Sequence, residues 1–172
     1  MNLFLIGYRG TGKTTLGKII ASKLNLDFID LDELIVKNAG KSIPEIFAQE
    51  GEPKFREYET QALEEACLGK EKIVSCGGGI ITKEGNINLL KKNGFVVLLK
   101  ANPETIFKRI YNDKNRPALT NKNPLDEIKH MLKVRNDAYE KAKDFEINTD
   151  KEKKLDCTKK ILEEYRKRIQ KI

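Results

Sequence analysis

Residues 7–14, with the sequence GYRGTGKT, have the types and spacing of a phosphate-binding loop and fit the pattern G-x-x-x-x-G-K-[ST] completely. Glycines allow backbone N–H groups to turn inward around phosphate oxygens. The ammonium group of Lys13 can reach the β- and γ-phosphates of a nucleotide, and the hydroxyl of Thr14 can bind Mg²⁺. The motif therefore predicts a site for ATP or GTP, but it does not identify the acceptor of the phosphoryl group.

The neighbours of this motif support that interpretation over a chance glycine-rich turn. Residues 2–6 form an apolar run without polar alternation, which is typical of a buried parallel strand. Residues 13–24 carry apolar side chains at helical spacing. A helix that begins directly after the loop adds unpaired N–H donors and the positive end of its dipole to an anion site.

Further groups of acidic, glycine and arginine residues occur along the chain, at the ends of the second and third predicted strands, on two predicted helices and in a polar loop. In chain order they are Asp30-Leu31-Asp32, Phe55-Arg56-x-x-Glu59, Gly77-Gly78-Gly79, Arg116-Pro117 and Arg135-x-x-x-Tyr139-x-x-Ala142. This set, in this order and near these spacings, resembles the shikimate kinase family over essentially the whole chain. The resemblance implies transfer of the γ-phosphoryl group of ATP to the 3-hydroxyl of shikimate, in aromatic amino-acid biosynthesis, with Mg²⁺ as cofactor.

The resemblance also implies a role for each matched residue. The catalytic residues would be Lys13, Asp32 and Arg116. Nucleotide contacts would come from Gly10, Thr11, Gly12, Lys13, Thr14, Thr15, Arg109 and Arg116, with Arg109 on the adenine. Shikimate contacts would come from Asp32, Arg56, Gly78, Gly79 and Arg135, and metal contacts from Thr14 and Asp30, the latter directly or through water.

Elementary chemistry is compatible with these roles. A guanidinium pairs with a carboxylate through two parallel hydrogen bonds, which suits Arg56 and Arg135 to the carboxylate of shikimate. Glu59 lies three residues after Arg56, so it could position that guanidinium, or the two could form an ordinary surface pair. Asp32 could accept hydrogen bonds from ring hydroxyls and act as the general base, or it could cap a helix.

Other residues of the resemblance are less distinctive. Phe47 and Phe55 resemble apolar walls of the site, although either could be plain core. The family often has Arg-Pro-Leu-Leu where this chain has Ala118 after Arg116-Pro117, and Thr where this chain has Cys76. His130 receives no role.

Apolar runs and helical patterns alternate along the chain. Strands are predicted at 2–6, 28–31, 73–76, 95–99 and 145–147, with helices between them, the second helix beginning at Asp32 or Glu33 after the second strand. This alternation predicts an α/β fold with a five-stranded parallel sheet flanked by helices, and the resemblance implies the P-loop, nucleoside-monophosphate-kinase-like type. We expect one domain over 1–172, with substrate-binding helices at about 33–61 and a mobile lid at about 112–124.

The amino-acid composition is typical of an ordinary globular protein with many charged residues. The 172 residues are 39% apolar and 34% charged, with a net charge of +7 and three cysteines. Without an export signal, reduced thiols and a cytoplasmic location are expected. We expect a monomer that binds small molecules, without a membrane or nucleic-acid partner.

The basic C-terminal segment is the main argument that the protein binds nucleic acid. Residues 151–172 hold nine Lys or Arg against four Asp or Glu. An apolar stripe at helical spacing, Leu155, Leu162, Tyr165, Ile169 and Ile172, favours a docking helix with a solvated charged face instead.

Two other functions stay open at this point. One is another small P-loop kinase, such as a gluconate or nucleoside-monophosphate kinase, and the other is a nucleic-acid-dependent or regulatory ATPase. The Asp-x-Asp sequence with Arg56 and Arg135 argues against the first, and no basic patch with interleaved aromatic residues supports the second.

Overall fold

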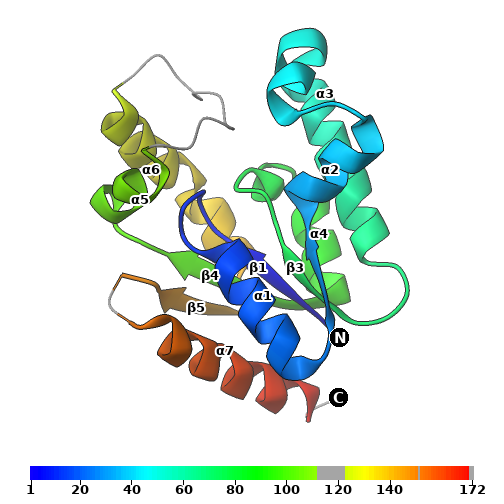
Figure 1. Cartoon of the computed structure of the whole chain (residues 1–172), viewed down its shortest axis with the longest axis vertical. Helices are drawn as coiled ribbons and strands as arrows, with labels where there is room; N and C mark the ends of the chain where they lie inside the picture. The colour runs from blue at the N-terminus through cyan, green and yellow to red at the C-terminus, as the bar shows by residue number, and fades with distance from the viewer. Residues whose placement is uncertain (112–122, 151, 171–172) are drawn as a thin grey trace.

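Five short strands form one parallel sheet at the centre of the computed structural model, which describes residues 1–111, 123–150 and 152–170 (Figure 1). The strands are β1 (Asn2–Ile6), β2 (Asp27–Asp30), β3 (Lys72–Ser75), β4 (Gly94–Lys100) and β5 (Phe145–Asn148). They lie in the order β2-β3-β1-β4-β5. This arrangement confirms the predicted α/β fold with a five-stranded parallel sheet.

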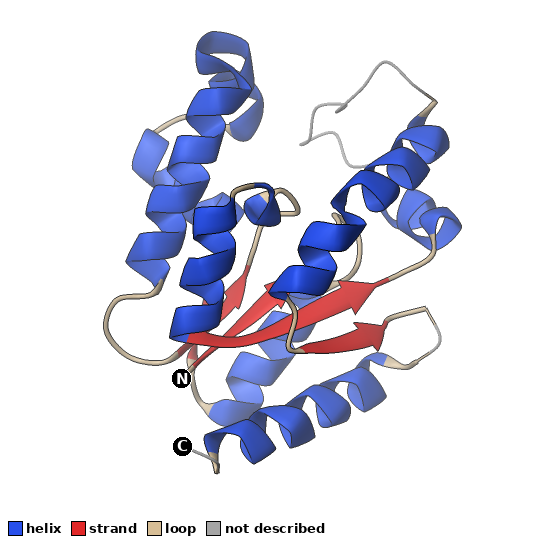
Figure 2. Cartoon of the chain, turned by 180° about the vertical axis from the view of Figure 1, so that it is seen from behind, coloured by secondary structure: helices blue, strands red, loops and turns tan. Residues whose placement is uncertain are grey.

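Helices cover both faces of the sheet, which explains why β1 is apolar at every position except its first (Figure 2). Leu3 and Leu5 pack on one side with α1 (Lys13–Leu24) and α7 (Lys154–Ile169). Phe4 and Ile6 pack on the other side in a core that includes α3, α4 and α6. The remaining helices are α2 (Leu31–Ala39), α3 (Ile43–Ala66), α4 (Glu84–Asn93), α5 (Pro103–Ile110) and α6 (Pro124–Ala142), with the 3₁₀ helix η1 (Ile80–Thr82).

The helix after β2 begins earlier than expected, at Leu31 rather than at Asp32 or Glu33. The cap is Asp30, whose Oδ1 accepts a hydrogen bond from the backbone N–H of Asp32 at 3.1 Å. The suggestion that Asp32 caps this helix is therefore wrong. Capping by Asp30 leaves the Asp32 side chain in the first turn of α2, where it lines the cavities described below.

The next helical region, α3, consists of two parts joined at a sharp break. Its start is a capping box, in which the side chains of Ser42 and Glu45 each accept a hydrogen bond from the other's backbone N–H. Gly51 interrupts the helix with φ 80° and ψ 171°, a conformation that is essentially restricted to glycine. The second part carries Arg56 and Glu59, so the break sets the direction from which these side chains reach the sheet.

The strand order places the functional motifs at one edge of the sheet. Strands β3 and β4 flank β1 and run parallel to it. The phosphate-binding loop follows β1, Asp30 ends β2, and the glycine triplet 77–79 follows β3. Because the carboxyl ends of parallel strands meet at one edge, residues distant in the sequence become neighbours there.

The C-terminal helix packs against the sheet as predicted, but not with every residue that the pattern indicated. Leu162 and Tyr165 are buried, whereas Leu155 and Ile169 are 62% and 44% exposed. Both exposed residues lie in terminal turns, where fewer neighbours cover a side chain, and Ile172 lies outside the described residues. The buried face is completed instead by Cys157, Thr158 and Ile161.

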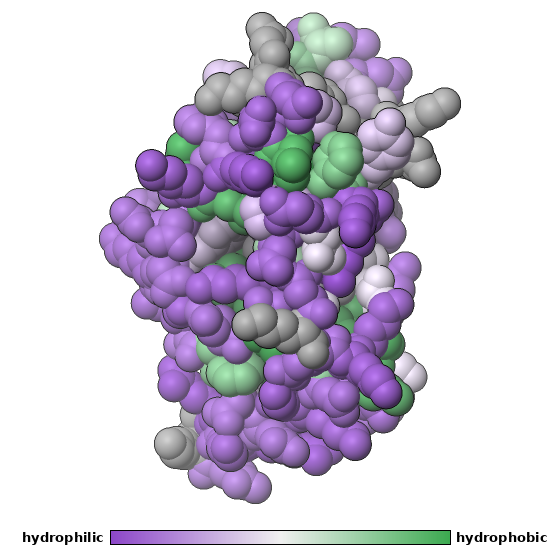
Figure 3. Space-filling model, turned by 90° about the vertical axis from the view of Figure 1, so that its left-hand side faces the viewer, coloured by the Kyte–Doolittle hydropathy of each residue, from purple (hydrophilic) through white to green (hydrophobic). Residues whose placement is uncertain are grey.

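The surface agrees with the charged composition. Hydrophilic residues cover most of the face shown in Figure 3, and hydrophobic residues appear there in small separate groups. Among the helices of the described residues, none is long and apolar enough to span a bilayer.

Candidate functional site

The phosphate-binding loop turns directly into helix α1 at Lys13. Gly12 caps the helix with φ 99° and ψ 14°, a left-handed conformation that a side chain would strain. Lys13 is only 8% exposed, and its Nζ donates hydrogen bonds to the carbonyl oxygens of Gly7 at 2.9 Å and Tyr8 at 3.0 Å. The ammonium group therefore lies within the curve of the loop, where phosphate oxygens are expected.

Beside the loop, oxygen donors from three elements come together. The hydroxyl of Thr14 donates to Oδ2 of Asp30 at 2.7 Å, and it lies 3.4 Å from the hydroxyl of Ser75. Hydroxyl and carboxylate oxygens are the donors that Mg²⁺ prefers, and it commonly takes only one or two protein ligands besides phosphate and water. This donor set therefore fits Mg²⁺, and it brings together the two residues predicted to contact the metal.

The loop lines a cavity whose walls are mostly polar or charged. Its walls include the predicted residues Gly10, Thr11, Gly12, Lys13, Thr14, Thr15 and Arg109, together with Asp30 and Asp32. Arg109 donates from Nη1 to the carbonyl oxygen of Gly10 and to the hydroxyl of Thr149, both at 3.1 Å. The structure thus places Arg109 beside the phosphate loop, while its contact with adenine stays a prediction.

A second cavity adjoins the first. It is lined by two phenylalanines, three arginines, two carboxylates and the glycine triplet; the predicted members are Asp32, Phe47, Phe55, Arg56, Glu59, Gly78, Gly79 and Arg135. Asp32 and Arg9 line both cavities. A molecule in the second cavity would therefore lie next to the phosphate end of a nucleotide in the first.

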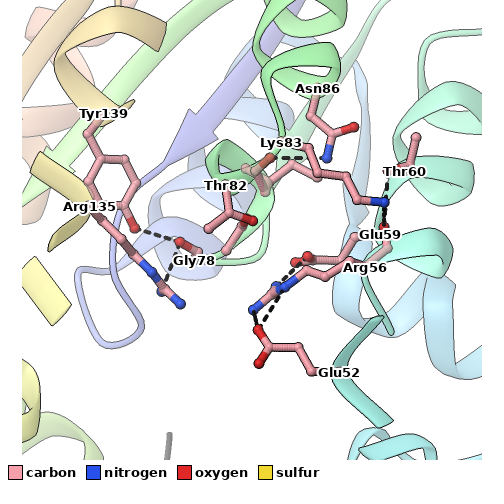
Figure 4. A network of polar contacts seen from close by, with 12 residues as sticks. Glu52, Arg56, Glu59, Thr60, Gly78, Thr82, Lys83, Asn86, Arg135 and Tyr139 are labelled. Atoms are coloured by element: carbon pink, nitrogen blue, oxygen red, sulfur yellow. Dashed lines mark hydrogen bonds and ion pairs between the residues drawn. The ribbon is translucent and has the colours of Figure 1, made fainter. Parts of the chain in front are cut away.

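Arg56 reaches this cavity from α3, and buried Glu59 positions it (Figure 4). Nη1 of Arg56 donates to Oε2 of Glu59, and the two side chains are 11% and 2% exposed. The predicted pairing is confirmed, and the interpretation as an ordinary surface pair is wrong. Burial raises the pKa of Glu59, and the charge of Arg56 opposes that rise.

Arg135 reaches the same cavity from α6, on the opposite side of the glycine triplet. Its Nη1 donates to the carbonyl oxygen of Gly78 at 3.1 Å, and the hydroxyl of Tyr139 donates to the same oxygen at 2.7 Å. Burial raises the pKa of Tyr139, so this phenol stays a neutral donor. Figure 4 shows the guanidinium ends of Arg56 and Arg135 pointing toward one space.

Gly78 also lies against the phosphate loop. A Cβ atom at Gly78 would stand 3.4 Å from the carbonyl oxygen of Gly7 and 3.5 Å from the backbone nitrogen of Arg9. The same Cβ would stand 3.5 Å from Nη1 of Arg135. One residue therefore contacts both the nucleotide loop and a candidate substrate arginine.

An ion pair between the phosphate loop and α6 was missed by the sequence reasoning. Nη2 of Arg9 lies 2.8 Å from Oε1 of Glu127, and their side chains are 17% and 3% exposed. The ring centroid of Tyr8 lies 5.7 Å from Cζ of Arg9 and 6.0 Å from Cζ of Arg135. No spacing in the sequence indicates this pair, because Arg9 and Glu127 lie on elements that are 118 positions apart.

Some sequence predictions fall where the structure gives no description. Arg116, Ala118 and residues 112–122 of the predicted lid lie outside the described residues. His130 is exposed, and no role is added for it. Cys76 is buried at the nucleotide cavity, and this burial raises the pKa of its thiol well above the usual range.

We predict that Gly79→Ala weakens binding in the second cavity without unfolding the protein. A Cβ atom at Gly79 would overlap Nη1 of Arg56 and lie 2.6 Å from its Cζ, so the guanidinium must move. The end of an arginine moves cheaply, and the backbone at Gly79 has φ −98°, which alanine adopts readily. We expect about a tenfold loss of affinity for the ligand of this cavity, equivalent to ~1.4 kcal/mol.

Isothermal titration with the acceptor substrate and with a nucleotide measures both sites of this variant. Gly85→Ala is the matched control, because nothing lies within 4 Å of a Cβ atom there. Loss of nucleotide affinity to the same degree would contradict a selective effect on Arg56.

Comparison with known proteins gives a consistent result. Residues 9–168 match the family model described as shikimate kinase. A shikimate kinase from Thermodesulfovibrio yellowstonii is 41% identical over 164 residues, covering 95% of this chain and 94% of that protein. The structure of shikimate kinase from Acinetobacter baumannii in complex with shikimate has a TM-score of 0.89 and 39% identity, with 94% of this chain and 90% of that chain covered.

A more distant likeness bears on one of the alternatives. The structure of a gluconokinase from Sinorhizobium meliloti aligns with 92% of this chain and 87% of its own, with a TM-score of 0.55 and 14% identity. At that identity the likeness shows a shared fold alone.

Proposed function

Because the chain belongs to the shikimate kinase family, we propose how its residues divide the work of transferring the γ-phosphoryl group of ATP to shikimate. The chain is an ATP-dependent kinase of the shikimate pathway. The gluconate or nucleoside-monophosphate kinase considered above is not favoured, and neither is a regulatory ATPase. The acceptor atom that we propose is the 3-hydroxyl oxygen of shikimate.

One observation supports this division most directly. Arg56 and Arg135 approach the same cavity from α3 and α6, and Asp32 lines both that cavity and the nucleotide cavity. A ligand with a carboxylate at one end and hydroxyls at the other fits this distribution of charge. Its carboxylate would pair with the two arginines, and a hydroxyl would then lie near Asp32 and the phosphate loop.

On the nucleotide side, the loop backbone and Lys13 bind the phosphates. Lys13 now donates to the carbonyls of Gly7 and Tyr8, and phosphate oxygens would replace these acceptors or share the ammonium group with them. Thr14 and Asp30 would hold Mg²⁺, which supplies positive charge against the β- and γ-phosphate oxygens when bound. Arg116, whose role rests on the sequence alone, is proposed to neutralise the transferring group.

On the acceptor side, Asp32 orients the 3-hydroxyl and accepts its proton. As the oxygen attacks the γ-phosphorus in line, the bond from that phosphorus to the β–γ bridging oxygen breaks. The phosphoryl group ends on shikimate, the electron pair of the broken bond ends on ADP, and the proton ends on the carboxylate of Asp32.

We also propose that the whole chain is one kinase domain that works as a monomer. The described residues of a single chain build both cavities, with α2 and α3 as the substrate-binding helices. The lid at about 112–124 and the cytoplasmic location stay predictions of the sequence.

A coupled assay of ADP release tests the proposed acceptor. Purified protein with ATP and Mg²⁺ is given shikimate, gluconate or a nucleoside monophosphate in separate reactions. Rapid ADP release should require shikimate, and the product should carry phosphate on its 3-oxygen by phosphorus NMR. Equal turnover with gluconate, or phosphorylation at another oxygen, would refute the assignment.

We predict that Arg56→Ala raises the KM for shikimate by about 30-fold, with little change in nucleotide affinity. Truncating one partner of a buried charge pair costs ~2–5 kcal/mol, and we expect the lower value because Arg135 remains to bind the carboxylate. Steady-state kinetics and nucleotide titration measure the two effects.

The matched control is Lys54→Ala, an exposed cation two residues away on the same helix. A nucleotide Kd that rises as much as the KM for shikimate would show that Arg56 does not bind the carboxylate selectively.

A further inference from the structure

Glu52 pairs with the Nε–Nη2 edge of the Arg56 guanidinium, which its contact with Glu59 leaves open. Oε1 of Glu52 accepts hydrogen bonds from Nε of Arg56 at 3.2 Å and from Nη2 at 2.7 Å. Nη1 of Arg56 donates to Glu59. Each nitrogen of this guanidinium therefore already donates to a carboxylate of the chain itself, as Figure 4 shows.

The two glutamates differ in how firmly they are placed. The side chain of Glu59 is 2% exposed, whereas that of Glu52 is 61% exposed. Breaking a buried pair leaves a desolvated charge, while an exposed carboxylate that leaves its partner is at once hydrated. Glu59 is thus the fixed support of Arg56, and Glu52 is the partner that can be exchanged.

The backbone places Glu52 for this contact. It follows Gly51, whose φ of 80° and ψ of 171° break α3, and it precedes Arg56 by four residues. Side chains four residues apart lie on one face of a helix. A glutamate in a first turn also interacts favourably with the helix dipole, but that effect requires no contact with Arg56.

Competition follows from the chemistry of the two carboxylates. The Nε–Nη2 edge of a guanidinium is one that pairs with a carboxylate through two parallel bonds, and Glu52 uses both of its donors. A shikimate carboxylate that takes this edge must displace Glu52. One that binds elsewhere on Arg56 still approaches a cation flanked by two negative charges.

We propose that Glu52 sets the affinity for shikimate by competing with its carboxylate for Arg56. This inference rests on the proposed role of Arg56. Glu52 acts through Arg56 and touches no reacting atom, so it is a positioning residue. Because exposed ion pairs are weak, its removal should improve the Kd and the KM for shikimate by about two- to fivefold. The kcat should not change.

The test compares Glu52→Gln with Glu57→Gln, a matched control one turn further along α3 with a side chain 52% exposed. Calorimetry measures the Kd for shikimate, and steady-state kinetics separates the effect on KM from the effect on kcat. Thermal melting reports any loss of stability that comes from removing a negative charge at the start of the helix. We expect tighter shikimate binding in Glu52→Gln alone, with kcat and nucleotide Kd unchanged. An unchanged or weaker Kd would overturn the proposal, because Glu52 would then be neutral or would support Arg56.

Failure of this inference is distinguishable from failure of the proposed site. If Arg56→Ala loses shikimate affinity while Glu52→Gln does not gain it, only the competition is refuted. If Arg56→Ala also leaves the affinity unchanged, the carboxylate role of Arg56 is wrong as well.

Discussion

Lys13→Met is expected to abolish phosphoryl transfer in a protein that still folds. Lys13 is the cation within the phosphate loop, and its Nζ is already oriented there by the carbonyls of Gly7 and Tyr8. Charge that develops on the transferring group would lose this partner in a site of low dielectric. We expect kcat to fall by about 10³-fold or more, which is ~4 kcal/mol of activation free energy.

The fold should survive this change because methionine is of similar length and removes a buried charge. Two carbonyls lose a donor, at a cost on the order of 1–3 kcal/mol each if no water replaces it. Lys23→Met is the matched control, since Lys23 is an exposed residue near the end of the same helix. Circular dichroism establishes folding, and ADP release measures turnover. Near-normal turnover in the folded Lys13→Met protein would refute the mechanism.

Asp32→Asn should have the second largest effect, through kcat. The substitution keeps the size of the side chain but removes its ability to accept a proton, and general base catalysis contributes about 10²–10⁴-fold. The variant still binds hydroxyls through its amide, so KM should change much less than kcat. The loss of rate at acidic pH that protonation of a base causes should also disappear.

The control for this change is Glu33→Gln, which alters the adjacent, exposed carboxylate in the same turn of α2. Rates of ADP release across the pH range distinguish the two possible uses of Asp32. A residue that only orients the hydroxyl would show a raised KM, a small change in kcat and an unaltered pH profile, and that result would contradict the base assignment.

The extent to which these features could be predicted depends on how local their causes are. The phosphate loop is a contiguous motif, so its eight residues and the apolar run before them were sufficient to predict a nucleotide site. The alternative in which Asp32 caps α2 is wrong because Asp30 and Asp32 are both suitable caps, and only the end of β2 decides between them. The prediction that Leu155 belongs to the buried face of α7 is wrong. Helical periodicity shows which side chains share a face, but it does not show where along the helix that face stops contacting the rest of the protein.

Contacts across the chain were harder to predict. Arg56 and Arg135 lie far apart in the sequence, and only the family resemblance paired them, since no spacing rule joins α3 to α6. The ion pair of Arg9 and Glu127 spans 118 positions. Neither member differs by type from the many charged residues of the chain, so the pairing depends on how α6 packs against the loop.

The contacts of Gly78 have a consequence for how the two substrates influence each other. Its carbonyl binds Arg135 and Tyr139, and its Cα faces the backbone of the phosphate loop. A shift of this peptide therefore reaches both ligands, which makes their binding free energies interdependent. Such coupling is reciprocal: the factor by which shikimate changes the Kd of the nucleotide equals the factor by which the nucleotide changes the Kd of shikimate. Two titrations, each repeated with the other ligand at saturation, must therefore close one thermodynamic cycle.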